Sequence, residues 1–69
     1  MIDVQTVGET AGVVWQYVKG HGRTTLTTLE RGIGAPSEVV LMAVGWLARE
    51  GKVELSQEKR SVYVKLTEK

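Results

Sequence analysis

The stretch Ser37–Val53, "SEVVLMAVGWLAREGKV", decides the fold of this chain. Its apolar residues recur every three or four positions, which is the period of an α-helix with one buried face. Pro36 suits the first position of such a helix, because the amide hydrogen that proline lacks has no partner there, and Gly51 suits its end. We therefore predict a helix over residues 36–50. Its predicted inward face consists of Val40, Ala43, Val44 and Leu47.

A first helix is predicted near the start of the chain. Thr6 and Glu9 have the spacing of a capping box, in which each side chain bonds a free amide of the first helical turn. The motif "KGHG" then ends the helix, because its two glycines weaken helical order. The stripe between these signals consists of Val7, Ala11, Val14, Trp15 and Val18.

A short second helix is predicted between the other two. A triplet that favours β-structure surrounds Thr25, and Thr27 and Glu30 repeat the capping-box spacing. Gly34 is placed to cap the end of this helix. The apolar side of the helix consists of Leu26, Leu29 and Ile33.

The C-terminal segment "KVELSQEKRSVYVKL" predicts a β-hairpin. Apolar and polar residues alternate on both sides of the charged centre "QEKR", and one face of the hairpin is expected to lie on the helices. The element order is therefore helix, short strand, helix, helix, hairpin. This order predicts an α+β winged helix over residues 1–69, a single domain in which the second and third helices form a helix-turn-helix and the hairpin is the wing.

Three segments of the chain are similar to a known family. "VGETAGVVWQYV", "VLMAVGWLAREGKVEL" and "VYVKL" resemble a family of small bacterial and archaeal winged helix-turn-helix proteins catalogued as a domain of unknown function. The resemblance covers nearly the whole chain, and its most specific part is "GWLARE". It implies the winged-helix fold, suggests dimers, and assigns no activity. The turn "GAPSE" departs from the family pattern but puts no functional residue in doubt.

The outward side of the third helix is unsuited to reading DNA. Helical geometry leaves Glu38, Leu41, Met42, Gly45 and Arg49 facing out, with Trp46 at the boundary. Apolar side chains form no hydrogen bonds with base edges, so only Arg49 is a natural reader. The apolar side chains would expose roughly a few hundred Å², and Gly45 would allow close approach of another backbone. We therefore predict a protein interface, most simply a twofold homodimer, at Leu41, Met42, Gly45 and Trp46.

Two arrangements within a single chain would also cover this patch. In one, Trp46 folds back against Trp15. In the other, the segment that contains Ile2 and Val4 lies over the third helix. The partner interface and cover within a single chain both weaken sequence-specific DNA recognition, and they differ in the oligomeric state that they predict.

The alternative function is a small transcription regulator that contacts DNA phosphates through its wing. Net charge +1 gives no broad attraction to phosphate, so any basic patch must be local. Glu58 lies beside the two basic residues of the wing in the sequence and would partly cancel their field, which favours an ordinary solvated turn. The candidate phosphate contacts are Arg31, Arg49, Lys52, Lys59 and Arg60.

The sequence predicts no enzyme, no cofactor and no small-molecule substrate. His21 is the only histidine and there is no cysteine, which excludes a two-His or Cys/His metal site and a histidine relay. His21 is expected to be an exposed loop residue. None of the serines lies in the strand-turn-helix elbow of a hydrolase nucleophile.

The predicted setting is the cytoplasm, without a membrane partner. No apolar run approaches the ~20 residues that cross a bilayer, and "MIDVQTVGET" lacks the features of a signal peptide. A 69-residue domain without cysteine gains no support from disulfides, which favours self-association. We therefore expect a non-catalytic winged-helix binding module that self-associates through its third helix.

Overall fold

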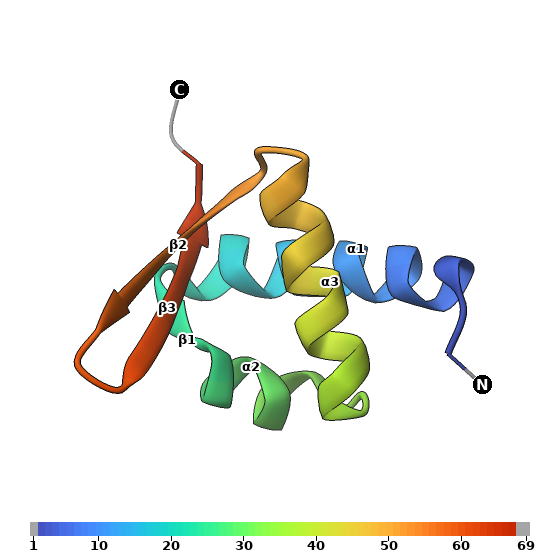
Figure 1. Ribbon diagram of the computed structural model, residues 1–69, viewed down its shortest axis with the longest axis horizontal. Helices are drawn as coiled ribbons and strands as arrows, with labels where there is room; N and C mark the ends of the chain where they lie inside the picture. The colour runs from blue at the N-terminus through green and yellow to red at the C-terminus, as the bar shows by residue number, and fades with distance from the viewer. Residues whose placement is uncertain (1, 68–69) are drawn as a thin grey trace.

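The computed structural model describes residues 2–67, which form a winged helix (Figure 1). Three helices pack together, and a three-stranded antiparallel sheet closes one side of them. The elements in chain order are α1 (Val4–His21), β1 (Thr24–Thr25), α2 (Leu26–Ile33), α3 (Ser37–Arg49), β2 (Val53–Glu58) and β3 (Ser61–Leu66). The predicted order of elements is confirmed.

Helix α1 begins earlier than its predicted capping box. Asp3 is the N-cap, and its Oδ1 accepts a hydrogen bond of 2.8 Å from the amide of Thr6. Glu9 accepts instead from the side chain of Gln5 at 3.2 Å, so the predicted Thr6–Glu9 box is wrong. An aspartate at this position accepts the bond as well as threonine does and adds a charge that favours the N-terminus of a helix.

Helix α2 also begins before its predicted capping box. The Oγ1 of Thr25 accepts from the amide of Thr28 at 3.1 Å, and Glu30 accepts from the hydroxyl of Ser37 at 3.4 Å. The Thr27–Glu30 box is therefore wrong. The prediction for the other end is confirmed, because Gly34 adopts the left-handed conformation with φ 79°, which glycine adopts without strain.

Helix α3 matches its prediction to within one residue at each end. Pro36 is the N-cap, and the chain leaves the helix through Glu50 and Gly51. The four residues predicted to face inward are all buried. Val39 is buried as well, which the predicted inward face did not include.

The sheet has the strand order β1-β3-β2, so β2 is an edge strand. Val53 pairs with Leu66 and Leu55 pairs with Val64, in the register expected of a hairpin. Val53 and Val64 are buried, but Leu55 is 48% exposed. The expectation that one face of the hairpin lies on the helices therefore holds for only part of β2.

The core lies between the three helices and the base of the sheet. It joins residues of all three helices to Val53 and Val64 of the sheet. In Figure 1, α3 crosses in front of α1, and no other element passes over the near side of α3. Burial of the inner side of α3 thus leaves its outer side without cover. The helical core residues are Ala11, Val14, Val18, Leu29, Val40, Ala43, Val44 and Leu47.

Candidate interface on the third helix and the wing

The outer side of α3 exposes large apolar side chains. Leu41 is 44% exposed, Met42 49% and Trp46 36%. Gly45 lies among them, and a Cβ added there would meet no atom within 4 Å. The four residues predicted as a protein interface therefore lie together on a surface that the chain leaves open. We call Leu41, Met42, Gly45 and Trp46 the α3 patch.

Trp46 lies at the edge of the α3 patch and leans across α1. An ideal Cβ on Gly8 would be 3.6 Å from Cη2 of Trp46. The indole therefore packs over the backbone of α1 at Gly8, the residue that has no side chain to block it. Trp15 lines the same open groove between α1 and α3. Trp46 therefore folds back over Gly8 of α1 and its ring stays partly exposed, whereas its packing against Trp15 stays a prediction.

The N-terminal segment does not cover the α3 patch. Ile2 and Val4 are themselves exposed. Residues from Val4 onward belong to α1, because Asp3 already caps that helix. The second arrangement within one chain is therefore wrong.

Two charged residues of opposite sign lie beyond the α3 patch, one at each end of the helix. Glu38 is in the first turn of α3 and Arg49 in its last turn, and both are exposed. In these places each favours its own end of the helix dipole. Within residues 2–67 neither side chain forms an ion pair.

The predicted phosphate contacts do not gather on one surface. Lys59 and Arg60 form the tip of the wing, where Lys59 has a positive φ of 56°, and Arg60 lines an open groove that reaches Leu41. Lys52 lies just before the start of β2, and the six residues of this strand separate it from the wing tip by about 20 Å. Its Nζ lies 3.7 Å from a carboxylate oxygen of Glu50. Arg49 and Arg31 lie at the ends of α3 and α2.

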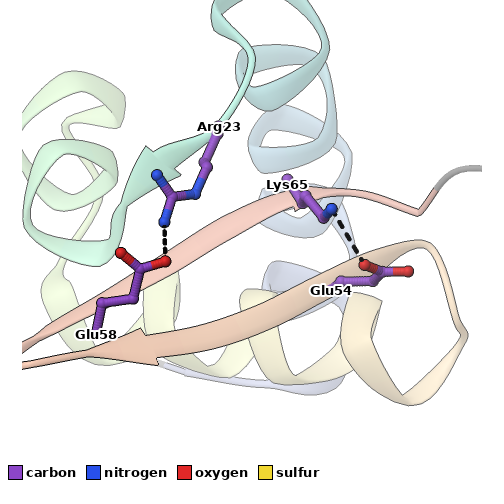
Figure 2. Close-up of polar contacts among 4 residues, drawn as sticks. All are labelled: Arg23, Glu54, Glu58 and Lys65. Atoms are coloured by element: carbon purple, nitrogen blue, oxygen red, sulfur yellow. Dashed lines mark hydrogen bonds and ion pairs between the residues drawn. The ribbon is translucent and has the colours of Figure 1, made fainter.

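A further basic residue near the wing, Arg23, was not among the predicted phosphate contacts. Its guanidinium carbon lies 3.7 Å from the ring centroid of Tyr63 on β3, and it forms an ion pair with Glu58 near the wing tip (Figure 2). Glu58 is therefore directed toward Arg23 and does less to offset the charges of its neighbours Lys59 and Arg60. Arg23 and Glu58 are 35 residues apart, so only the pairing of the strands brings them together.

The same face of the sheet has a second ion pair. Lys65 of β3 lies 3.6 Å from Glu54 of β2, its neighbour across the hairpin (Figure 2). All four charged side chains of the two pairs are about half exposed, and pairs of this kind contribute at most about 1 kcal/mol each. This face of the wing therefore has mixed charge rather than a continuous basic surface.

The described residues do not form a metal site. No three His, Cys, Asp or Glu side chains among residues 2–67 come close enough together to hold a metal ion. His21 is exposed but ends α1 rather than lying in a loop, and its ring stacks on Tyr17 with centroids 4.0 Å apart. In the same part of the chain, no helix is long and apolar enough to cross a membrane.

Two solved structures have a similar fold. A Bacteroides thetaiotaomicron protein determined by NMR in solution has a TM-score of 0.83 and 31% identity, with 94% of this chain and 79% of that chain covered. The Zalpha domain of Carassius auratus PKZ, crystallised in complex with Z-DNA, has a TM-score of 0.75 and 22% identity, with 87% of this chain and 95% of that chain covered. Both support the winged-helix architecture.

The sequence comparisons agree with the fold. An uncharacterized protein of Methanocaldococcus jannaschii is 36% identical over 63 residues, which cover 87% of this chain and 89% of the relative. A family model described as "Winged helix-turn-helix domain (DUF2582)" matches residues 1–66. The resemblance expected from the sequence is confirmed, and the chain belongs to this winged helix-turn-helix family.

Proposed function

We propose that this protein is a non-catalytic winged-helix module that forms a homodimer through the α3 patch. The observation that supports this proposal is the exposure of Leu41, Met42 and Trp46 together on one side of α3. Water around such a patch is released when a second apolar surface covers it, which favours association. A second copy is the simplest occupant, because a twofold axis places the same patch on both sides of the interface.

The composition of the patch favours protein over DNA as its partner. Methionine and tryptophan are enriched in the buried centres of protein interfaces. None of the residues in the patch offers the paired hydrogen-bonding groups with which Arg, Asn or Gln read bases in the major groove. Glu38, at the start of the same helix, would repel a phosphate backbone.

Met42 is the residue with which to test the dimer. It is 49% exposed, so a glutamate there is tolerated in the monomer, whereas a charge buried in an apolar interface costs several kcal/mol. We expect sedimentation equilibrium at micromolar concentration to show a dimer for the parent and a monomer for Met42→Glu. Trp46→Glu is a weaker test because Trp46 also packs over Gly8.

Val13→Glu is the matched control for this experiment. Val13 is 52% exposed in the middle of α1 and does not belong to the α3 patch, so its variant is expected to sediment like the parent. Circular dichroism should show unchanged helix content in both variants. A parent that remains monomeric up to about 100 μM would refute the proposal, because any remaining affinity would be weaker than about −5.5 kcal/mol.

DNA binding through the wing is the second candidate function, that of a small transcription regulator. One observation favours it: a domain of the same fold, the Carassius auratus Zalpha domain, was crystallised with Z-DNA. Lys59 and Arg60 lie at the exposed wing tip, and Arg23 engages the nearby Glu58. These residues give the tip a local excess of positive charge in a chain whose net charge is only +1.

Titration of fluorescent duplex DNA at low salt tests this second function. If the wing binds phosphates, replacing both Lys59 and Arg60 by alanine should weaken binding and reduce the log–log salt slope by about 1.8, since each contact contributes about 0.9. The matched control is Lys19→Ala/Lys65→Ala, which removes the same charge from α1 and the base of β3. Equal binding by the parent and the wing variant, or none by either, would exclude the wing as a DNA contact.

A further inference from the structure

The outer side of α3 has a heptad-like seam. Glu38, Met42, Gly45 and Arg49 follow one another at spacings of four, three and four residues, and all four are exposed. This spacing keeps the residues on one line along a helix and is the spacing at which two helices pack side by side. Leu41 lies on one flank of the seam and Trp46 on the other. The α3 patch is therefore the apolar middle of a seam that has a charge at each end.

We propose that two copies of this chain pair their α3 helices antiparallel, so that Glu38 of each protomer meets Arg49 of the partner subunit. The proposal rests on the homodimer proposed above and specifies the orientation of its two chains. Glu38 and Arg49 are eleven positions apart, which corresponds to about 16 Å along the helix. An antiparallel pair related by a twofold axis repeats the contact at both ends.

The seam is also complementary in shape in this arrangement. When Glu38 lies level with the partner's Arg49, Met42 lies level with the partner's Gly45. A Cβ on Gly45 would meet nothing within 4 Å in the isolated chain, so the space above it is open. A flexible methionine side chain from the partner subunit fits such a space, and the glycine lets the two backbones approach closely.

The charges distinguish the antiparallel from the parallel arrangement. A parallel pair would place Glu38 beside the partner's Glu38 and Arg49 beside the partner's Arg49, and both contacts would be repulsive. The two helix dipoles would also point the same way. Neither side chain has an ion-pair partner within residues 2–67 of its own chain, so both are available to a second copy.

Charge reversal tests the orientation. In the antiparallel dimer, Glu38→Arg places two arginines together at both ends of the interface, and Arg49→Glu does the same with two glutamates. We expect each single variant to associate at least about tenfold more weakly than the parent, because two attractive pairs become repulsive. The double variant Glu38→Arg/Arg49→Glu restores both pairs and should associate within about threefold of the parent.

An equimolar mixture of the two single variants tests whether opposite charges drive association. One chain then offers arginine at both positions and the other glutamate at both, so the antiparallel pair is attractive at each end. A parallel pair of these two chains would also be attractive, so the orientation is read from the loss of association in each single variant and its recovery in the double variant. Sedimentation should show heterodimers in the mixture at concentrations where each variant alone is monomeric. The double variant also tests a simpler explanation. If the single variants lost association only because each reversed charge opposes the dipole of α3, the double variant would combine both unfavourable charges and be the least stable of the set.

Glu9→Arg is the control for net charge, since it changes an exposed glutamate on α1 by the same amount and should leave association unchanged. If the parent dimerises but the single variants associate as strongly as the parent, or the double variant shows no recovery, the antiparallel orientation is wrong and the homodimer stands. If the parent is monomeric, the homodimer proposal is wrong, and so is the proposed orientation that depends on it. Circular dichroism of every variant at a common concentration shows whether its helix content is retained, which separates a loss of association from a loss of fold.

Discussion

Asp3 sets the start of the longest helix with one side chain. Its carboxylate accepts the amide of Thr6, and this hydrogen bond lowers the pKa of Asp3 below its ordinary value of 3.8. A carboxyl group whose pKa is lowered on folding contributes stability above its ordinary pKa and loses that contribution as the pH falls through the folded value. The cap of α1 is therefore expected to weaken in acid.

The substitution Asp3→Asn tests this pH dependence. Asparagine keeps the oxygen that accepts the amide but has no titratable proton, so its cap does not weaken in acid. At pH 7 we expect the parent to be at least as stable as the variant, and below about pH 4 to lose stability relative to it. Thermal unfolding of both proteins at neutral and acid pH gives the comparison. A difference in Tm that stays constant over this range would contradict the role assigned to the carboxylate.

Gly32 lies close to the ring of Tyr17. A Cβ at Gly32 would lie 2.7 Å from the ring of Tyr17, which itself stacks on His21. Overpacking by the new methyl group typically costs about 1–3 kcal/mol, and alanine gains at most about 1 kcal/mol in helix propensity over glycine. We therefore expect Gly32→Ala to lower the free energy of unfolding by a net amount of about 1–2 kcal/mol. Chemical denaturation measures the change. In a Tyr17→Leu background the same substitution should no longer destabilise, and persistence of the full loss there would show that the ring is not the cause.

At the scale of elements, the inner side of α3 stabilises the fold and its outer side is proposed to bind a second copy of the chain. Its inner side is buried in the core and its outer side exposes the α3 patch. Gly45 weakens this helix, because glycine costs about 1 kcal/mol relative to alanine in a helix interior. A residue that lowers the stability of the monomer but leaves room for a partner fits a helix whose outer side serves association.

The substitution Gly45→Ala separates these two effects. Because no atom lies within 4 Å of the new methyl group, the monomer should gain up to about 1 kcal/mol. The dimer should weaken, because the methyl group occupies the space proposed for Met42 of the partner subunit. Gly12→Ala on α1 also meets no neighbour and should give the gain in stability without the loss of association. Stronger association of the Gly45→Ala variant would contradict close approach at this residue.

The size of the whole molecule links association to stability. Its 69 residues include no cysteine, and the buried core is drawn from only eleven hydrophobic residues among those described. Small domains of this kind have a low free energy of unfolding. An interface that buries further apolar surface therefore adds a large fraction of the total free energy of unfolding. Stability should therefore depend on protein concentration.

Thermal unfolding at several concentrations tests this dependence. For a dimer that dissociates on unfolding, each tenfold increase in concentration adds about 1.4 kcal/mol per dimer, which corresponds to a rise in Tm of about 3–5 °C for a domain of this length. The Met42→Glu variant should show no such rise, and Val13→Glu should behave like the parent. A parent whose Tm is independent of concentration would count against a dimer that contributes to stability.

Hydrophobic period and local backbone chemistry were enough to predict the architecture. The period of the residues around Val40 and Leu47 predicted α3 and its buried side, Gly34 and Gly51 marked helix ends, and the alternation around "QEKR" predicted the hairpin. Each of these features depends on residues within a few positions of one another. The choice between neighbouring caps was harder, because Asp3 and Thr6, or Thr25 and Thr27, differ little in their capacity to accept an amide.

The sequence by itself determined the winged-helix order of elements and the apolar outer side of α3, because helical and strand periodicities assign each residue to a side of its own element. Only the tertiary structure decided what each side meets. Strand pairing brings Arg23 onto Tyr63 and Glu58, and the crossing of α1 and α3 lays Trp46 over Gly8. These contacts join residues that are 35 or more positions apart, and their formation depends on how whole elements pack rather than on any local pattern.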